Sequence, residues 1–372
     1  MAVLQADIKP VDPTDPFRNP TEEPEYSPDY RAILPEIDKP DAALPLIPSP
    51  EEAVSIRKMF SLVFLSLMFG FFTTATVHTA LTLGLPMLLR VIDMQREGSL
   101  PQNYGQIVQQ YFSDSSISMS ITLLSCFIGN LSGFWVGCRL THLSWQDFFK
   151  TRRFTLSRMM MYTVIGLWIQ LITGEGTQLL SKYLSQFGIS IRMEHLAVDG
   201  SATRLAVTAV YACLIAPLTE ELLFRGILMK NAARVGQRFA IFLSAFFFAL
   251  AHQNPVQMIF TFPLGIFLGY ITMRHNSLTP AILVHILVNT VSVLSALGES
   301  NLPASTFRTV SMIYTLSMLA VGTAVFMYLS VTERLPDRTP HQGFRCLRIA
   351  GASPLFWGLI IMHIAAALYP FF

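Results

Sequence analysis

Charged residues are scarce in this sequence. Of 372 residues, 13% are Asp, Glu, Lys or Arg, which is about half the share usual in a soluble domain. The net charge of +2 is too small to predict a nucleic-acid partner. The four cysteines form no close pair and no metal-knuckle spacing, so we expect them to serve packing. The N-terminus also lacks the basic region and apolar core of a cleavable signal peptide.

Long apolar runs are what the sequence has instead. A helix needs about 20 apolar residues to cross the hydrocarbon core of a bilayer, and irregular backbone is not viable against lipid. The sequence therefore predicts an all-α, polytopic transmembrane bundle of about eight to nine helices with a polar intramembrane cavity, in contact with the lipid bilayer. The nine predicted helices cover residues 59–90, 116–138, 158–181, 203–229, 237–252, 256–273, 279–297, 309–331 and 352–370.

Lys and Arg residues fall at every second connection between these runs. Cytoplasmic loops carry the excess of Lys and Arg, so this spacing predicts nine crossings with a cytoplasmic N-terminus. The loops 91–115, 183–202 and 298–308 would then face outward. The basic residues are Arg57, Lys58, Lys150, Arg152, Arg153, Lys230, Arg234, Arg238, Arg274, Arg334, Arg338, Arg345 and Arg348.

Four regions follow from these patterns. Residues 1–56 contain eleven prolines in the first fifty positions, with acidic residues between them, and are predicted to be a disordered cytoplasmic tail whose partner is unknown. Residues 57–200 hold the N-terminal transmembrane helices. Residues 201–300 hold the polar groups described next, and residues 301–372 hold the C-terminal transmembrane helices.

The fourth apolar run contains charges that membrane helices normally avoid. Glu220, Glu221 and Arg225 lie within six residues of one another, although a charge at mid-bilayer costs roughly 2.5–3.5 kcal/mol on insertion scales. Glu221 and Arg225 are spaced i and i+4, so they can pair on one helix face. Glu220 points about 100° away and has no local partner. A structural role for the ion pair remains the plainer alternative.

Two later runs add polar groups at a similar depth. His252 ends the fifth run, and His285 and Asn289 share one face of the seventh. At 1.5 Å per residue, Glu220 and these three groups fall in one layer near the middle of the membrane. Taken singly, His285 and Asn289 could be an interhelical hydrogen-bonded pair and His252 a structural histidine. His78, His363, Asn130 and Gln170 are interpreted as packing or interfacial groups.

These three motifs carry a family resemblance. Glu-Glu-x-x-x-Arg, Phe-x-x-x-His and His-x-x-x-Asn, in this order on three helices, resemble the CPBP intramembrane proteases. That family comprises type II CAAX prenyl endopeptidases and bacteriocin-processing or immunity proteins, also called the Abi family. The resemblance covers about residues 203–297, where a Gly265-x-x-x-Gly269 pair also predicts close helix packing.

The resemblance implies an intramembrane endopeptidase with a cavity opening toward the cytoplasm. Glu220 and His252 would activate a water, and His285 and Asn289 would stabilise the oxyanion. Glu221 and Arg225 would orient the helix and the first glutamate. The substrate would be a membrane-associated peptide or protein, and the site would lie in a bacterial cell membrane.

Three questions stay open at this point. Glu220, His252 and His285 would also make a zinc-binding set of two histidines and one glutamate. We expect no tightly bound ion, because the Arg225 guanidinium one turn away opposes a divalent cation. The alternatives to a protease are a catalytically silent scaffold or immunity protein, and a proton-coupled transporter that uses Glu220 and the histidines as a relay.

Overall fold

The computed structural model describes residues 50–99, 103–106, 115–149, 154–187, 202–333 and 343–368. In these ranges the chain is helical and contains no strand, which confirms the predicted all-α bundle. The proline-rich tail up to residue 49 lies outside the described residues, as do several of the loops used to predict the orientation. That orientation stays a prediction.

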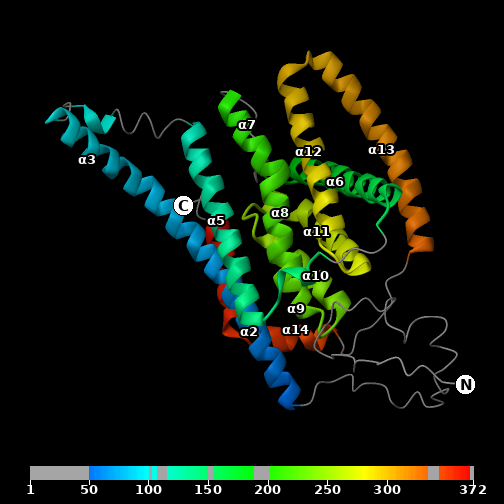
Figure 1. Ribbon diagram of the computed structural model, residues 1–372. Helices are drawn as coiled ribbons and strands as arrows, with labels where there is room; N and C mark the ends of the chain where they lie inside the picture. Colours follow the sequence, from blue (N-terminus) through cyan, green and yellow to red (C-terminus); the bar gives the residue numbers. More distant parts are fainter. Residues whose placement is uncertain are drawn as a thin grey trace, which may run out of the picture.

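The first helix runs without a break from Pro50 to Glu97 (Figure 1). The remaining helices match the predicted apolar runs, with ends that differ by several residues. Their bounds are α2 (Pro50–Thr79), η3 (Ala80–Gly84), α3 (Leu85–Glu97), α5 (Ser115–Thr141), α6 (Leu156–Ser185), α7 (Ala202–Val210), η5 (Tyr211–Ile215), α8 (Ala216–Glu220), η6 (Glu221–Met229), α9 (Lys230–Ala232), α10 (Gln237–Leu250), α11 (Pro255–His275), α12 (Thr279–Asn301), α13 (Ala304–Thr332), α14 (Gly343–Gly351) and α15 (Pro354–Leu368).

Helix α2 begins six residues before the predicted end of the tail at residue 56. Pro50 stands at the first position of the helix, where a proline is well tolerated because its missing N–H has no helical partner. Glu51 and Glu52 follow in the first turn, where carboxylates interact favourably with the helix dipole. The described part of the first helix therefore starts at Pro50, within the segment that was predicted as tail.

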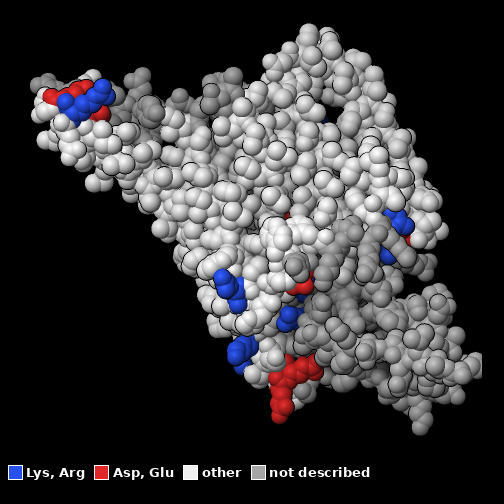
Figure 2. Space-filling model, viewed as in Figure 1, with Lys and Arg blue, Asp and Glu red and all other residues white. Residues whose placement is uncertain are grey.

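Six helices of the described chain are long and apolar enough to cross a membrane. Helices α10 and α15 have 14 and 15 residues, so they rise only about 21–23 Å and fall short of a 30 Å hydrocarbon core. Every predicted run forms a helix, but α10 and α15 are too short for the nine full crossings that the sequence suggested. On the face seen in Figure 2, charged side chains gather at the upper-left tip, in the lower part and at the right-hand edge. A wide uncharged surface lies between them, as a membrane belt requires.

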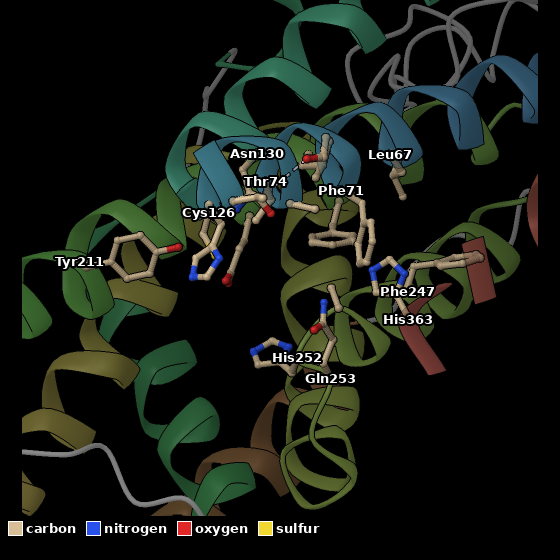
Figure 3. Close-up of a pocket in the computed structure, with 18 residues that line it drawn as sticks. Leu67, Phe71, Thr74, Cys126, Asn130, Tyr211, Phe247, His252, Gln253 and His363 are labelled. Carbon is tan, nitrogen blue, oxygen red and sulfur yellow. Dashed lines mark hydrogen bonds between the residues drawn. The ribbon is translucent and has the colours of Figure 1, made fainter. Parts of the chain in front are cut away.

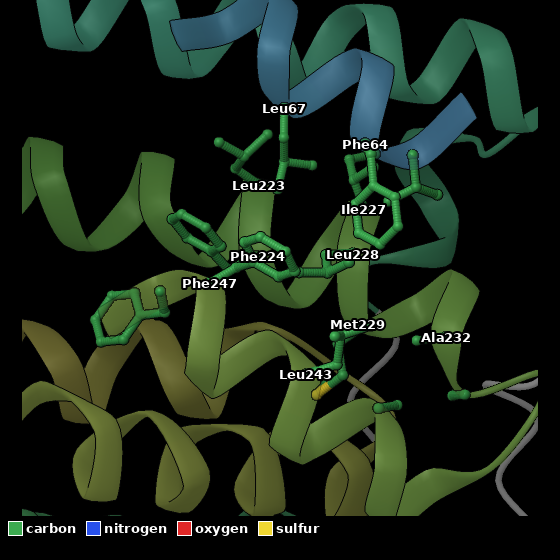
Figure 4. Close-up of a cluster of buried hydrophobic side chains, with 14 of the residues drawn as sticks. Phe64, Leu67, Leu223, Phe224, Ile227, Leu228, Met229, Ala232, Leu243 and Phe247 are labelled. Atoms are coloured by element: carbon green, nitrogen blue, oxygen red, sulfur yellow. The ribbon is translucent and has the colours of Figure 1, made fainter. Parts of the chain in front are cut away.

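The helix that spans residues 202–232 occupies the centre of the bundle (Figure 1). In the most apolar 18-residue stretch of this helix 44% of the residues are buried, whereas in that of α13 only 6% are. Helix α13 therefore turns its apolar side chains outward, where lipid would cover them. One buried cluster joins this central helix to α2 and α10, and Figure 4 shows Phe64, Leu223 and Phe247 meeting within it. A second cluster joins α6, α11, α12 and α13.

The central helix contains two π-helical stretches, η5 and η6, on either side of α8. A π turn takes more residues than an α turn, so it changes the direction in which later side chains point. Such turns occur often at functional sites. Here they flank Glu220 and therefore set the face on which the two adjacent glutamates project.

Glycines let α11 approach α10 closely, as predicted. A Cβ at Gly265 would lie 3.1 Å from the Ala245 Cα, and one at Gly269 would lie 3.2 Å from the Ile241 Cγ2. Both distances are shorter than ordinary van der Waals contact, so a larger residue would push the helices apart. This packing places the Gly265 carbonyl within reach of the central helix.

Candidate active site

Glu221 contacts two other polar side chains in a buried cluster. Its Oε1 lies 3.0 Å from the Arg225 Nη1 and 3.0 Å from the His285 Nδ1. The side chains of Glu221 and Arg225 are completely buried. The predicted i, i+4 ion pair therefore forms, and it extends to a histidine on α12 that the spacing did not indicate.

Arg225 is held by three different groups. Besides Glu221, its Nη2 donates a hydrogen bond to the Gly265 carbonyl at 3.1 Å, and its Cζ lies 4.2 Å from the centre of the Phe248 ring. An arginine can satisfy these contacts at once because its planar guanidinium combines several donors with a face that stacks on aromatic rings. Helices α10 and α11 are thus tied to the central helix at this one side chain.

Glu220 differs from its neighbour in its surroundings. Its side chain is 20% exposed, and its Oε2 lies 3.9 Å from the His285 Nε2, beyond hydrogen-bond length. The two nitrogens of His285 thus face the two adjacent glutamates, Nδ1 toward Glu221 and Nε2 toward Glu220. The prediction that Glu220 is not part of the Arg225 ion pair agrees with this geometry.

His252 lies just beyond the end of α10. Its Nδ1 is 2.8 Å from the Phe248 carbonyl oxygen, so Nδ1 carries the proton that this contact needs. In the neutral ring, Nε2 is then left as the acceptor. The Phe248 ring stands edge-on to both histidines, with its centre 4.9 Å from His252 and 5.8 Å from His285. Gln253, the next residue, has a φ of 53°, which turns the chain sharply away from the helix.

Asn289 lies one turn beyond His285 on α12. Its Nδ2 donates a 2.8 Å hydrogen bond to the carbonyl of Ala212, which belongs to the π-helical stretch η5. The amide nitrogen has a second N–H, which leaves one donor beyond this contact. Asn289 and His285 line the same cavity, which agrees with the prediction that they share a face.

Two cavities meet at this cluster. The first, here called the α2 cavity, has a volume of about 390 Å³ and lies between α2, α5, the central helix and α10. The second, the α12 cavity, has a volume of about 540 Å³ and lies between α6, the central helix, α11 and α12. Glu220, His252 and Tyr211 line both. His285 and Asn289 line only the α12 cavity.

Several residues of this region were interpreted from sequence as packing groups. His78, His363 and Asn130 line the α2 cavity together with Glu220, and Gln170 lines the α12 cavity. Figure 3 shows Thr74, Asn130 and Tyr211 on one side of the α2 cavity, with His252 across from them. Asn130 also donates a 3.2 Å hydrogen bond to Thr219, the neighbour of Glu220.

The residues do not fit the zinc set that the sequence left open. Within the described part of the chain, no three His, Cys, Asp or Glu side chains gather closely enough to hold a metal ion. His285 directs Nδ1 to Glu221, and its Nε2 is 3.9 Å from Glu220. Glu221 thus occupies one nitrogen of His285, and only Nε2 faces Glu220.

The α12 cavity extends from Glu220 toward the connection between α12 and α13. Glu175, Glu299 and Tyr314 also line it, and Glu299 lies near the C-terminal end of α12, the end away from Arg274. The positive-inside pattern assigns that end to the outer side. The orientation and the opening of the cavity toward the cytoplasm both stay predictions.

Comparison with known proteins gives one family. A model of the family described as type II CAAX prenyl endopeptidase Rce1-like matches residues 202–291. This stretch contains all three motifs, so the match confirms the resemblance to the CPBP proteases. The comparisons with curated proteins and with solved structures gave no match. Protease activity of the CAAX type is therefore supported at the level of the family.

Proposed function

We propose that this protein is an intramembrane endopeptidase that hydrolyses a peptide bond of a membrane-associated substrate. The observation that carries the proposal is the different placement of two adjacent glutamates. Glu221 is fully buried against Arg225, whereas Glu220 is partly exposed and lines two cavities beside His252. A general base has to reach water, and only Glu220 of this pair meets that condition.

In the proposed reaction, Glu220 and His252 hold a water and Glu220 takes its proton. The resulting hydroxide adds to the scissile carbonyl in the α12 cavity, and His285 and Asn289 donate hydrogen bonds to the oxyanion. Collapse of the tetrahedral intermediate breaks the C–N bond. The proton held by Glu220 then passes to the leaving amine, so the carboxylate is restored.

The charges around His285 suit this sequence of steps. The proposed reaction requires a proton on both nitrogens of His285, so that Nδ1, 3.0 Å from Glu221, donates to it and Nε2, which faces Glu220, can donate to the oxyanion. When Glu220 accepts a proton, negative charge disappears there and appears on the oxyanion beside the same Nε2–H. His285 therefore faces a negative group on its Nε2 side at every stage, which keeps the cost of charge movement in a buried site small.

The test is cleavage of a farnesylated peptide that ends in a CAAX sequence, by purified protein in detergent, with the fragments identified by mass spectrometry. We expect cleavage by the wild type and at least a roughly 100-fold loss in Glu220→Gln, because the amide cannot accept the proton. Glu97→Gln is the matched control, since Glu97 lies in α3 outside both cavities. Full turnover by Glu220→Gln would refute the proposed mechanism. The same peptide without its farnesyl group tests whether the lipid is required.

A further inference from the structure

The two cavities differ in which proposed catalytic groups they contain. His285 and Asn289, the oxyanion donors of the proposed reaction, line only the α12 cavity. The scissile carbonyl must reach these donors, so the substrate occupies the α12 cavity. The α2 cavity lies on the other side of Glu220 and His252, and the proposed reaction assigns it no role.

The lining of the α2 cavity mixes apolar side chains with several polar ones and is nearly uncharged. It includes the hydroxyl of Thr74, the amides of Asn130 and Gln253, and the imidazoles of His78 and His363. Its only carboxylate is Glu220, and it contains no Lys, Arg or Asp. Such a lining offers several hydrogen-bond partners for water and, apart from Glu220, no charged group.

The volume of the α2 cavity is also large enough to hold several water molecules. Water occupies about 30 Å³ per molecule in the liquid, and a buried water needs two to four polar partners. A cavity of about 390 Å³ has room for a chain of waters rather than a single one. Thr74 and Asn130 approach from one wall, and His252 and Gln253 stand on the other (Figure 3), so polar atoms face the space from both sides.

The proposed reaction needs a supply of water, and the α2 cavity lies where it can provide one. Each turnover consumes one water, and a peptide in the α12 cavity displaces water from that side of Glu220. The hydrocarbon of the bilayer supplies none. We propose that the α2 cavity is a dedicated water reservoir that delivers the nucleophile to Glu220 and His252 from the side opposite the substrate. This inference rests on the proposed protease function.

The first experiment measures access to each cavity by thiol labelling. Thr74→Cys and Ser292→Cys are made separately after Cys126, Cys138, Cys213 and Cys346 are replaced by alanine, each in the Glu220→Gln background so that bound peptide is not cleaved. The probe is a small charged methanethiosulfonate, applied with and without a saturating farnesylated CAAX peptide. Both substituted side chains line their cavities and are close to cysteine in size.

We expect the reagent to modify the Thr74→Cys protein at the same rate with and without peptide, and the peptide to protect the Ser292→Cys protein. Protection of both would mean that substrate fills the α2 cavity and would overturn the proposal. Reaction of Thr74→Cys with a lipid-soluble maleimide but not with the charged reagent would overturn it too, because the cavity would then open to lipid. This labelling needs no cleavage, so its result stands even if the protein hydrolyses no CAAX peptide.

The second experiment separates kcat from KM and keeps the natural cysteines. Thr74→Val with His78→Leu removes two polar partners of water in the α2 cavity while keeping side-chain bulk. We expect kcat to fall about tenfold while KM stays nearly constant, because water supply, not substrate binding, is affected. Ser295→Val in the α12 cavity is the matched change and should act mainly on KM. An unchanged kcat in the Thr74/His78 variant with wild-type melting would refute the reservoir.

Discussion

Replacing Arg225 by alanine tests the buried cluster most directly. The change would leave the Glu221 carboxylate in a fully buried place with His285 as its remaining partner. It would also remove the hydrogen bond to the Gly265 carbonyl and the stacking of the guanidinium on Phe248. Breaking a buried pair by removing one partner costs about 3–5 kcal/mol. We therefore expect Arg225→Ala to unfold more easily as well as to lose activity.

The measurement is thermal unfolding of purified protein in detergent. At about 2–4 °C per kcal/mol for a chain of this class, the loss corresponds to a fall in Tm of roughly 6–20 °C. The matched control is the double variant Glu221→Gln with Arg225→Met, which removes both charges and keeps the volume. We expect it to melt well above Arg225→Ala, because no unpaired charge stays buried. A Tm of Arg225→Ala equal to that of the wild type would refute the ion pair as a structural element.

Three further experiments test the site and the N-terminal tail. Asn289→Ala should lower kcat by roughly 100-fold with little change in KM, as expected when one oxyanion donor is lost, and steady-state kinetics would detect an effect on KM instead. Elemental analysis of active protein should find no stoichiometric zinc; about one zinc per chain, with activity lost on chelation and restored by zinc, would make Glu220, His252 and His285 ligands after all. Deletion of residues 1–45, which spares the start of α2 at Pro50, should leave peptide cleavage unchanged, and loss of catalysis in a folded protein would make the tail part of the enzyme.

Much of this arrangement could be predicted because it depends on short-range spacing. Glu221 and Arg225 are four residues apart on one helix, so their pairing follows from helix geometry alone. The depth of Glu220, His252 and His285 follows from the rise per residue, and the family match supports their grouping. The close approach at Gly265 follows from the absence of side chains at Gly265 and Gly269.

The remaining features depend on how each helix is rotated about its axis and on contacts between residues far apart in the sequence. The depth of a residue in the membrane determines neither. The contact between Glu221 and His285 joins residues 64 positions apart. The angle between the two glutamates also depends on the π-helical stretches η5 and η6, whereas the prediction assumed a regular α-helix. For the same reason Asn130 and His78 were interpreted as packing groups, since nothing in their own helices shows that they line a cavity with Glu220.

The buried cluster around Arg225 has a consequence for how the protein is made. The central helix carries Glu220, Glu221 and Arg225, and its outside partners Phe248, Gly265 and His285 lie between 23 and 60 residues further along the chain than Arg225. When this helix emerges, these partners still lie inside the ribosome or have not yet been synthesised, and each charge on the helix opposes entry into lipid by about 2.5–3.5 kcal/mol. We therefore expect the helix to stay in the insertion machinery until α10, α11 and α12 arrive. A nascent chain that stops before α12 should be recognised as unassembled and degraded.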